Sequence, residues 1–328
     1  MLHGWIILDK PVGLGSTTAV SAVKRILRQA GEPKTKVGHG GTLDPLASGV
    51  LPIALGEATK LCGRMLDASK AYDFTIRLGQ ETDTLDAEGK LVATSDIRPK
   101  LEQILAILPR FTGIIEQVPP AYSALKMGGK AAYSRARAGE TVEMKPRRVS
   151  VHDLNLIAAM GADGEKDHGA TQNGGGAPSP GLRAGSSQWL GMEKIDAITL
   201  SATVSKGTYI RSLARDIAYA LGTVGHVSYL RRTRAGPFSL EQAILLDFLE
   251  EAAKSRRLTE TVLPLTAALD DIPALPVTPD QARLLRYGQM LFGVPAKPGL
   301  AIATAEGTPV ALVEATAGGL KVVRGFNL

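Results

Sequence analysis

The sequence predicts a protein of the α+β class, and three observations lead to that prediction. Apolar and polar side chains alternate over residues 72–78, which is typical of a strand with one buried face. Apolar residues recur at helical spacing over residues 20–30, after a short apolar strand at residues 5–8. Short apolar runs joined by glycine-containing turns predict a small β-rich region near the C-terminus, with strands at 301–303, 310–313 and 321–323.

Length and charge bound the class of protein. The chain has 328 residues, 44% of them hydrophobic, which suffices for a sizeable core and for about two domains of roughly 150 residues each. Its net charge of +6 suits a polyanionic partner, of which nucleic acid is the usual kind. The single cysteine, Cys62, excludes an internal disulfide framework, and its apolar setting indicates a small core residue.

The sequence shows no pattern typical of a signal peptide or a membrane-spanning segment. The N-terminal apolar run is too short for a signal peptide and lacks a basic lead. No apolar run reaches the roughly 20 residues that are needed to span a bilayer. We therefore expect a cytoplasmic protein with no membrane contact.

The first helix has clear start and stop signals. Ser16, Thr17 and Thr18 form a cluster of good N-cap residues, and Gly31 is a natural stop. The basic residues of this helix lie largely off its apolar stripe, as expected of a solvated face. A second helix is expected from Glu57 to about Leu66, just before the strand at 72–78.

The middle of the chain alternates helices and strands. We expect helices at 98–111, 130–139, 240–249 and 281–288, another from residue 259 onward, and strands at 149–154 and 198–204. The segment 205–216 is expected to turn into a helix that ends near Gly222. The Pro119–Pro120 pair argues against a strand interior and indicates a rigid connection that packs on the core. Residues 161–191 break this pattern, and the low-complexity stretch 174–181 within them predicts a flexible insertion at the tip of a hairpin.

Candidate chemistry lies in the segment 38–49, GHGGTLDPLASG. Its glycines allow backbone angles that a β-carbon forbids, and Pro45 disfavours a helical conformation at Asp44. The apolar run 49–56 that follows is expected to be buried. A carboxylate on a glycine loop against an apolar floor suits covalent or acid–base chemistry. An ordinary Asp-Pro turn is the alternative, because Asp and Gly dominate turns for local reasons.

This segment resembles the catalytic motif of the TruB family of tRNA pseudouridine-55 synthases, GHxGxLDPxA[ST]G, and it matches every fixed position. Residues 70–79 resemble the family motif KxYxxxxxLG, and residues 117–126 resemble QxPxxYSAxK. Residues 205–211 resemble SKGTYIR, and residues 226–232 resemble H[VLI]xxLRR. The blocks occur in the family's order and extend the resemblance from about residue 4 to residue 234.

The resemblance implies that Asp44 is the essential catalytic carboxylate and that Arg211 is its partner. A cation beside an acid keeps the acid ionised and fixes its orientation. From the residues alone, Arg211 could instead pair with Asp216 or with a surface acid. The carboxylate could attack the base, attack the sugar or remove a sugar proton, and these routes stay open.

The resemblance also implies four substrate-binding residues. Tyr72 would stack on the flipped base, and His39, Tyr209 and Leu230 would hold the nucleotide. Stacking on tyrosine is a normal way to hold an unpaired base. From the pattern alone, Tyr72 could be a core aromatic at the sheet end, and His39 could be a satisfied loop histidine.

Several charged residues have weaker assignments. Lys10 is either an exposed turn lysine or a phosphate contact, and His226 is expected to be structural. The acidic loop at 80–86 could be mistaken for a metal site, but the family needs no metal, so we interpret it as structural. Three arginines near His226 are suited to contacts with RNA phosphates: Arg231, Arg232 and Arg234.

The resemblance implies the whole organisation of the molecule. A catalytic domain at 1–250, with a mixed and mostly antiparallel sheet flanked by helices, precedes a connecting helix and linker at 251–275. A PUA-like RNA-binding domain follows at 276–328. The substrate would be the T-arm of tRNA, whose uridine 55 is flipped out and isomerised to pseudouridine without cofactor or metal. The family suggests a monomer with no obligate protein partner.

Two other functions are compatible with the same residues. One is a guide-RNA-dependent pseudouridine synthase relative, which shares the aspartate motif. The other is a tRNA-folding or RNA-binding protein without catalysis, although the presence of Asp44, Tyr72 and Arg211 argues against a purely non-catalytic role.

Overall fold

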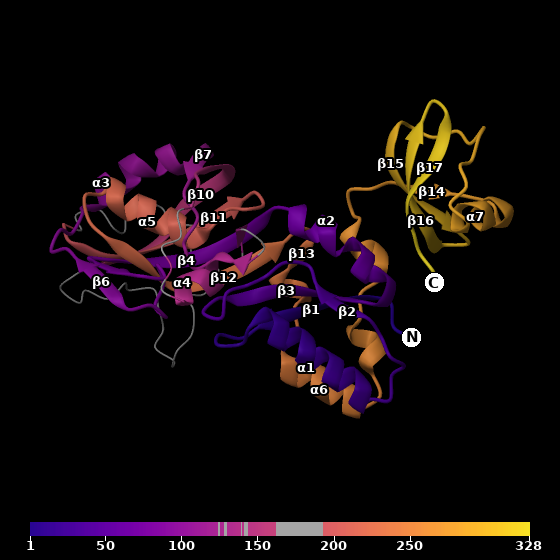
Figure 1. Cartoon of the computed structure of the whole chain (residues 1–328), viewed down its shortest axis with the longest axis horizontal. Coiled ribbons are helices and arrows are strands. Elements are labelled where there is room, and N and C mark those ends of the chain that lie inside the picture. Colours follow the sequence, from indigo (N-terminus) through magenta and orange to yellow (C-terminus); the bar gives the residue numbers. More distant parts are fainter. Residues whose placement is uncertain (124, 128–129, 139, 141–143, 162–192) are drawn as a thin grey trace. The chain divides into compact units, whose positions relative to one another are not determined.

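The computed structural model describes residues 1–123, 125–127, 130–138, 140, 144–161 and 193–328 (Figure 1). The chain folds into two compact units. The first contains residues 1–44, 49–66 and 235–328, and the second contains residues 45–48 and 67–234. The domain boundaries that the resemblance implies, at residues 250 and 275, remain a prediction.

The first unit begins with two long antiparallel strands. Strand β1 (Gly4–Lys10) pairs with β3 (Ser48–Leu55) from Gly4 opposite Leu55 to Lys10 opposite Gly49. The short strand β2 (Val37–His39) also pairs with β3. Every residue of β3 is buried, so the burial predicted for the apolar run 49–56 is confirmed up to Leu55.

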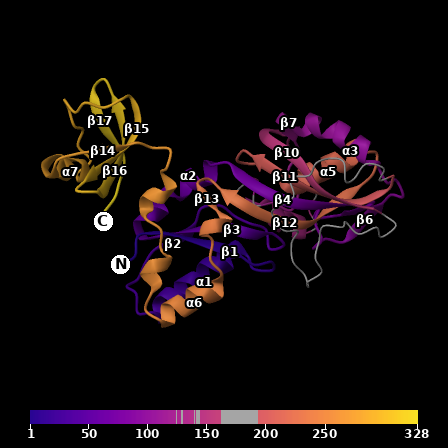
Figure 2. The ribbon, with the colours of Figure 1, turned by 180° about the vertical axis from the view of Figure 1, so that it is seen from behind.

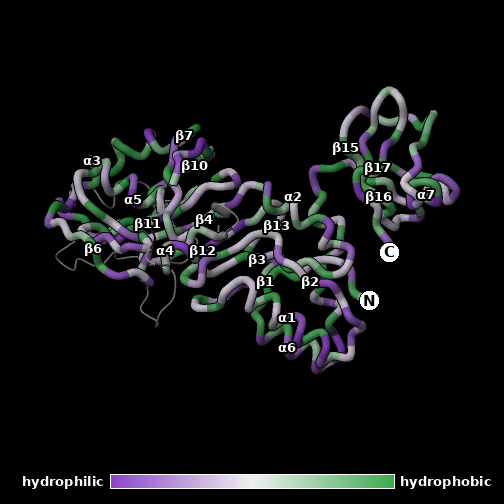
Figure 3. The backbone as a smooth tube through the Cα atoms, in the orientation of Figure 1, coloured by the Kyte–Doolittle hydropathy of each residue, from purple (hydrophilic) through white to green (hydrophobic). Residues whose placement is uncertain are grey.

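Helix α1 (Ser16–Gln29) packs beside α6 (Leu246–Lys254) in the first unit (Figures 1 and 2). Hydrophilic and hydrophobic residues alternate along both helices, as Figure 3 shows. The apolar stripe of α1, including Val20, Val23 and Ile26, is buried as predicted. Arg25 on α1 donates to Glu250 on α6 at 2.9 Å.

The remaining helical segments of the first unit are shorter than predicted. The segment expected as a helix at 57–66 is a 3₁₀ helix, η1 (Gly56–Leu61), followed by α2 (Cys62–Asp67). The continuous helix predicted at 240–249 is wrong. Residues 240–249 contain only the 3₁₀ turn η4 (Leu240–Gln242), after β13 (Phe238–Ser239), and then the start of α6; two more 3₁₀ turns follow, η5 (Leu258–Thr261) and η6 (Leu265–Ala268).

The second unit is built on a sheet with the strand order β12, β4, β11, β10, β7. These strands are β12 (Gly225–Ala235), β4 (Lys70–Leu78), β11 (Ile195–Val204), β10 (Arg147–Gly161) and β7 (Gly113–Gln117). Strand β11 pairs antiparallel with both β4 and β10, and β10 pairs antiparallel with β7. The strands predicted at 72–78, 149–154 and 198–204 are confirmed.

Helices and small hairpins complete the second unit. Helix α5 (Ile210–Ala220) packs against β4. The helix predicted at 98–111 is divided into α3 (Leu101–Ile107) and the 3₁₀ turn η2 (Leu108–Phe111). The smaller elements are β5 (Gln80–Thr82) with β6 (Leu91–Thr94), β8 (Lys126–Met127) with β9 (Lys130–Ala131), and α4 (Ala132–Arg137).

The insertion predicted at 161–191 falls between the two paired strands β10 and β11, which confirms its place in a hairpin. Its expected flexibility concerns residues 162–192, which lie outside the described residues. No helix in the described part of the chain is long and apolar enough to cross a membrane.

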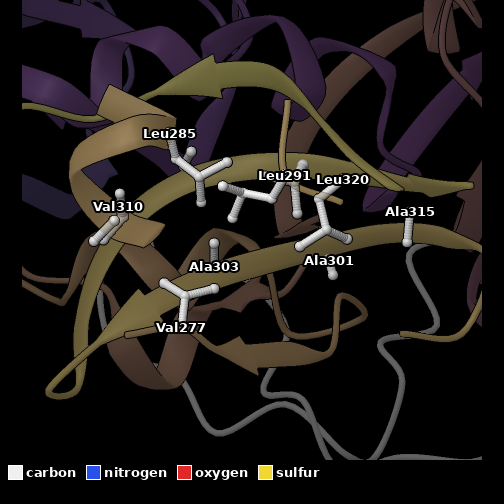
Figure 4. Close-up of a cluster of buried hydrophobic side chains, with 11 residues drawn as sticks. Val277, Leu285, Leu291, Ala301, Ala303, Val310, Ala315 and Leu320 are labelled. Carbon is white, nitrogen blue, oxygen red and sulfur yellow. The ribbon is translucent and has the colours of Figure 1, made fainter. Parts of the chain in front are cut away.

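The C-terminal region is β-rich, as predicted. Strands β14 (Ala274–Pro276), β15 (Gly299–Ala305), β16 (Thr308–Thr316) and β17 (Gly319–Gly325) form a sheet in chain order. Helix α7 (Pro279–Arg286) buries Leu285 against this sheet (Figure 4). Ala301, Ala303 and Val310 line the same core, so this region has its own hydrophobic cluster.

Candidate active site

The Asp44 loop is built on the end of β2. His39 lies opposite Ile53 on β3, and the amide of Gly40 donates to the Pro52 carbonyl at 2.8 Å. A β-carbon at Gly40 would lie only 2.8 Å from Met65 on α2, so α2 approaches this loop as closely as glycine allows. The loop is therefore supported from both a strand and a helix.

Ser16 secures the other side of this loop. Its hydroxyl donates to the Leu43 carbonyl at 2.9 Å and accepts from the Leu43 amide at 2.8 Å. The predicted N-cap role of the cluster at 16–18 is wrong, because Gly15 is the N-cap residue and no side-chain cap is formed. Ser16 instead fixes the backbone of the residue before Asp44, whose own side chain is half-buried.

His39 is half-buried beside the same loop, and its Nδ1 accepts from the Gly41 amide at 3.4 Å. Gly41 adopts a φ of 139°, in the region that favours glycine. His39 therefore has the hydrogen bond within the loop that the residues alone suggested. Its contact with the substrate remains a prediction.

The second unit carries the other four predicted site residues. Tyr72 is a half-buried residue of β4, opposite Ala202 on β11. Leu230 lies on β12, the strand next to β4, and is buried. Tyr209 and Arg211 lie at the start of α5, where Tyr209 is the N-cap residue. The sheet therefore places Tyr72 and Leu230 on neighbouring strands.

Arg211 is buried in a cage of acceptors. Its Nη1 lies 3.2 Å from Asp86 Oδ2, and the two side chains are only 7% and 3% exposed. Nη1 also donates to the Thr84 carbonyl at 2.9 Å, and Nη2 donates to the Tyr122 carbonyl at 3.0 Å. These acceptors fix the guanidinium plane, as a fork of fixed donors allows.

Asp86 is the functional candidate that the sequence reasoning missed. Its Oδ1 accepts from the Thr84 hydroxyl at 2.5 Å and from the Glu88 amide at 3.1 Å. The acidic loop is structural, as interpreted, but it also supplies the carboxylate that faces Arg211. No local spacing signals this pair, since Asp86 and Arg211 are far apart in sequence.

Asp216 is the alternative partner that the sequence left open for Arg211. The structure pairs Asp216 with the adjacent Arg215 at 2.7 Å instead. Asp44 belongs to the first unit and Arg211 to the second, so the pairing of Asp44 with Arg211 stays a prediction.

Several basic residues are more buried than predicted. The interpretation of Lys10 as an exposed turn lysine is wrong, because its side chain is fully buried. Its Nζ donates to the carbonyls of Pro11 at 2.9 Å and Leu14 at 2.7 Å. Arg232 is also fully buried, so an exposed phosphate contact is wrong there. His226 is structural as expected, since its Nδ1 lies 2.8 Å from the Gln80 carbonyl.

Burial also tunes titratable groups around Tyr72. Burial, together with the nearby Arg232 guanidinium, lowers the pKa of Lys70 to about 8. Burial raises the pKa of Asp73, although a hydrogen bond with Ser201 opposes the shift.

Neither a cofactor nor a metal was expected at this site. Within the described ranges, no three side chains of the His, Cys, Asp and Glu types gather as a metal site would require. The chemistry available at Asp44 is acid–base and nucleophilic chemistry.

The fold has known counterparts. A solved structure of an H/ACA RNP bound to a substrate RNA matches with a TM-score of 0.68 at 24% identity, covering 99% of this chain and 86% of that one. A Cbf5–Nop10–Gar1 complex matches with a TM-score of 0.65 at 25% identity, covering 99% and 84%. The fold is that of the pseudouridine synthases, with a β-rich C-terminal region.

Sequence comparison identifies the family. Residues 24–167 match the model described as TruB family pseudouridylate synthase (N terminal domain), and residues 211–270 match the tRNA pseudouridylate synthase B C-terminal domain. A tRNA pseudouridine synthase B of Novosphingobium aromaticivorans is 56% identical over 328 residues, covering 100% of this chain and 98% of the relative. One of Zymomonas mobilis is 55% identical over 326 residues, covering 99% and 96%. The chain belongs to the TruB family of pseudouridylate synthases.

Proposed function

We propose that this protein isomerises uridine 55 in the T-loop of tRNA to pseudouridine, with Asp44 as the essential carboxylate. The observation that carries the proposal is the complete aspartate motif, presented on a loop that β3, α2 and Ser16 hold in place. The similarity of the whole chain to tRNA pseudouridine synthases B supports the substrate class.

The reaction exchanges one bond to the ribose for another. The bond from C1′ to N1 of uracil breaks, the base turns, a bond from C1′ to C5 forms, and C5 loses its hydrogen as a proton. Asp44 serves as nucleophile or base in the first stage, and the choice between base attack, sugar attack and sugar deprotonation stays open. No other reactant enters, so atoms balance between uridine and pseudouridine.

The remaining site residues have supporting roles in this proposal. Arg211 keeps Asp44 ionised and oriented. Tyr72 stacks on the flipped uracil, and His39, Tyr209 and Leu230 hold the nucleotide. The T-arm is the only macromolecular partner that the reaction requires, so we propose a monomer that acts on free tRNA in the cytoplasm. The C-terminal β-rich region supplies further RNA contacts.

Tritium release from tRNA transcripts carrying [5-³H]uridine tests the proposal, because pseudouridine formation expels the hydrogen at C5. The purified protein alone should release tritium from wild-type transcript and none from a transcript with cytidine at position 55. Equal release from both transcripts would place the activity at another uridine. Binding of tRNA without any release would favour a guide-dependent enzyme or a folding role.

A further inference from the structure

Gln117, the last residue of β7, is a buried polar residue that the reaction described so far does not use. Its side chain is 2% exposed, and its Oε1 accepts from the Tyr209 amide at 2.8 Å. Because a backbone amide is a donor, the oxygen of the Gln117 amide must face Tyr209. The contact joins the end of β7 to the N-cap of α5.

Residues 117–122, which we name the strap, contact the first turn of α5 from outside, in addition to the contacts of Thr84 and Asp86 with Arg211. Tyr209 makes no side-chain cap of its own. The carbonyl of Val118 accepts from the Ser212 hydroxyl at 2.8 Å and from Arg215 Nη2 at 3.2 Å. At the far end of the strap, the Tyr122 carbonyl accepts from Arg211. The strap therefore helps to set where Tyr209 and Arg211 lie relative to the sheet.

The other end of the Gln117 amide argues against a purely stabilising role. Within the described chain, its Nε2 is buried with no hydrogen-bond partner, and the same holds for Ser123 Oγ. A buried donor without a partner is destabilising, whereas an apolar side chain of similar shape carries no such cost. The Nε2 group of Gln117 thus destabilises the fold, while its Oε1 fixes the backbone of Tyr209.

We propose that Gln117 is a positioning residue for the isomerisation, which acts by fixing the N-cap of α5 and thereby the placement of Tyr209 and Arg211. The inference rests on the proposed function and deepens it. It adds to the site a residue that touches neither the base nor Asp44 in the proposed roles. Its effect is expected on the chemical step, because small displacements of reacting groups slow catalysis strongly.

Two substitutions in the full-length protein separate the acceptor from the rest of the side chain. Gln117→Met removes Oε1 and Nε2 at similar volume, and single-turnover isomerisation of tRNA should slow about 10- to 100-fold. The Kd for tRNA should stay within about twofold, since contacts with the RNA phosphates supply most of the binding free energy. Gln117→Glu keeps an oxygen facing the Tyr209 amide at a helix N-terminus, where negative charge is favourable, and should retain most of the rate.

Thr223→Val is the matched control at the other end of α5. Thr223 is also buried, and its hydroxyl donates to the Ile97 carbonyl at 3.1 Å. This variant should lower the melting temperature at least as much as Gln117→Met does, yet isomerise tRNA at the wild-type rate.

Three results would overturn the inference. The first is a wild-type rate in Gln117→Met. The second is a loss in Gln117→Met that appears only in tRNA affinity. The third is an equal slowing by Thr223→Val, which would mark a general effect of stability. A wild-type protein that does not isomerise tRNA at all would overturn the proposed function itself, and the positioning role with it.

Discussion

At the scale of single residues, the buried pair of Arg211 and Asp86 dominates the second unit. Both side chains are almost fully excluded from water, so each charge depends on fixed partners. Thr84 contacts both members, with its carbonyl toward Arg211 and its hydroxyl toward Asp86. Breaking one member of such a pair is costly because the other remains buried.

Asp86→Asn should therefore destabilise the fold by about 3 kcal/mol, the usual cost of removing one member of a buried pair. The substitution keeps the shape of the side chain and removes its charge. Urea denaturation of wild type and variant measures the difference. Asp196→Asn is the control, since its pair with Arg98 is partly exposed and should contribute less than about 1 kcal/mol. Equal losses in both variants would contradict this account of the pair.

At the scale of elements, the Asp44 loop takes its shape from contacts that a sequence pattern does not show. Ser16 makes two hydrogen bonds to Leu43, one to each backbone group. A serine at a helix start predicts a cap from local rules, but this hydroxyl is taken up by a distant loop instead. Ser16, which the sequence predicted to cap the helix, instead fixes the backbone of Leu43, the residue before Asp44.

Ser16→Ala should lower stability by about 1–2 kcal/mol, because it leaves both buried backbone groups of Leu43 without this partner. The rate of isomerisation should fall as well, since Asp44 follows directly. Ser21→Ala removes a side-chain bond to the Thr17 carbonyl on the exposed face of the same helix, and should change neither quantity. A Ser16→Ala protein with full activity would show that the loop keeps its shape without this residue.

Local pattern predicted the elements well where one face is buried, and it failed where a tertiary contact intervened. The alternation at 72–78 and the stripe of α1 are confirmed. The predicted helix at 240–249 is interrupted at Ile244, which pairs with strand β1. Its amide donates to the Ile7 carbonyl, and its carbonyl accepts from the Asp9 amide. Pairing with a strand far away in the sequence thus overrode helical spacing. The partner Asp86 was missed for the same reason.

At the scale of the whole molecule, the end of the chain is anchored near its beginning. Lys60 on η1 donates to Glu57 at 2.6 Å and to the Gly325 carbonyl at 2.9 Å, and Glu57 accepts from the Asn327 amide at 2.8 Å. Burial alone would raise the pKa of Glu57, but the hydrogen bonds from Lys60 and Asn327 outweigh it and hold the pKa below its usual value. The anchor is therefore ionic at neutral pH.

A carboxylate whose folded pKa is lowered adds stability above its ordinary pKa of 4.5, and that stability is lost as the pH falls through the folded pKa. Glu57→Gln should thus increase amide hydrogen exchange at residues 325–328 about tenfold at pH 7, as expected for a charged hydrogen bond. The difference from wild type should shrink in acid. Glu251→Gln, in the exposed pair with Lys254, should leave these amides unchanged. A difference that persists unchanged in acid would contradict the ionic anchor.

The sequence motifs named the candidate site residues one segment at a time and did not show which segments lie together. Asp44 and its glycines lie together, and the loop they predicted is present. The sequence placed Tyr72 and Leu230 in separate motifs, and only the sheet order shows that their strands are neighbours. The assignment of Arg211 to Asp44 rests on the family resemblance, since the two residues belong to different compact units.

The most direct measurement of the central claim is tritium release by Asp44→Asn compared with wild type on [5-³H]uridine tRNA. Asparagine keeps the shape of the side chain and removes its capacity as nucleophile and base. We expect release by wild type, none by the variant, and equal affinity of the two proteins for tRNA. Release by Asp44→Asn at the wild-type rate would contradict the assignment of the chemistry to this carboxylate.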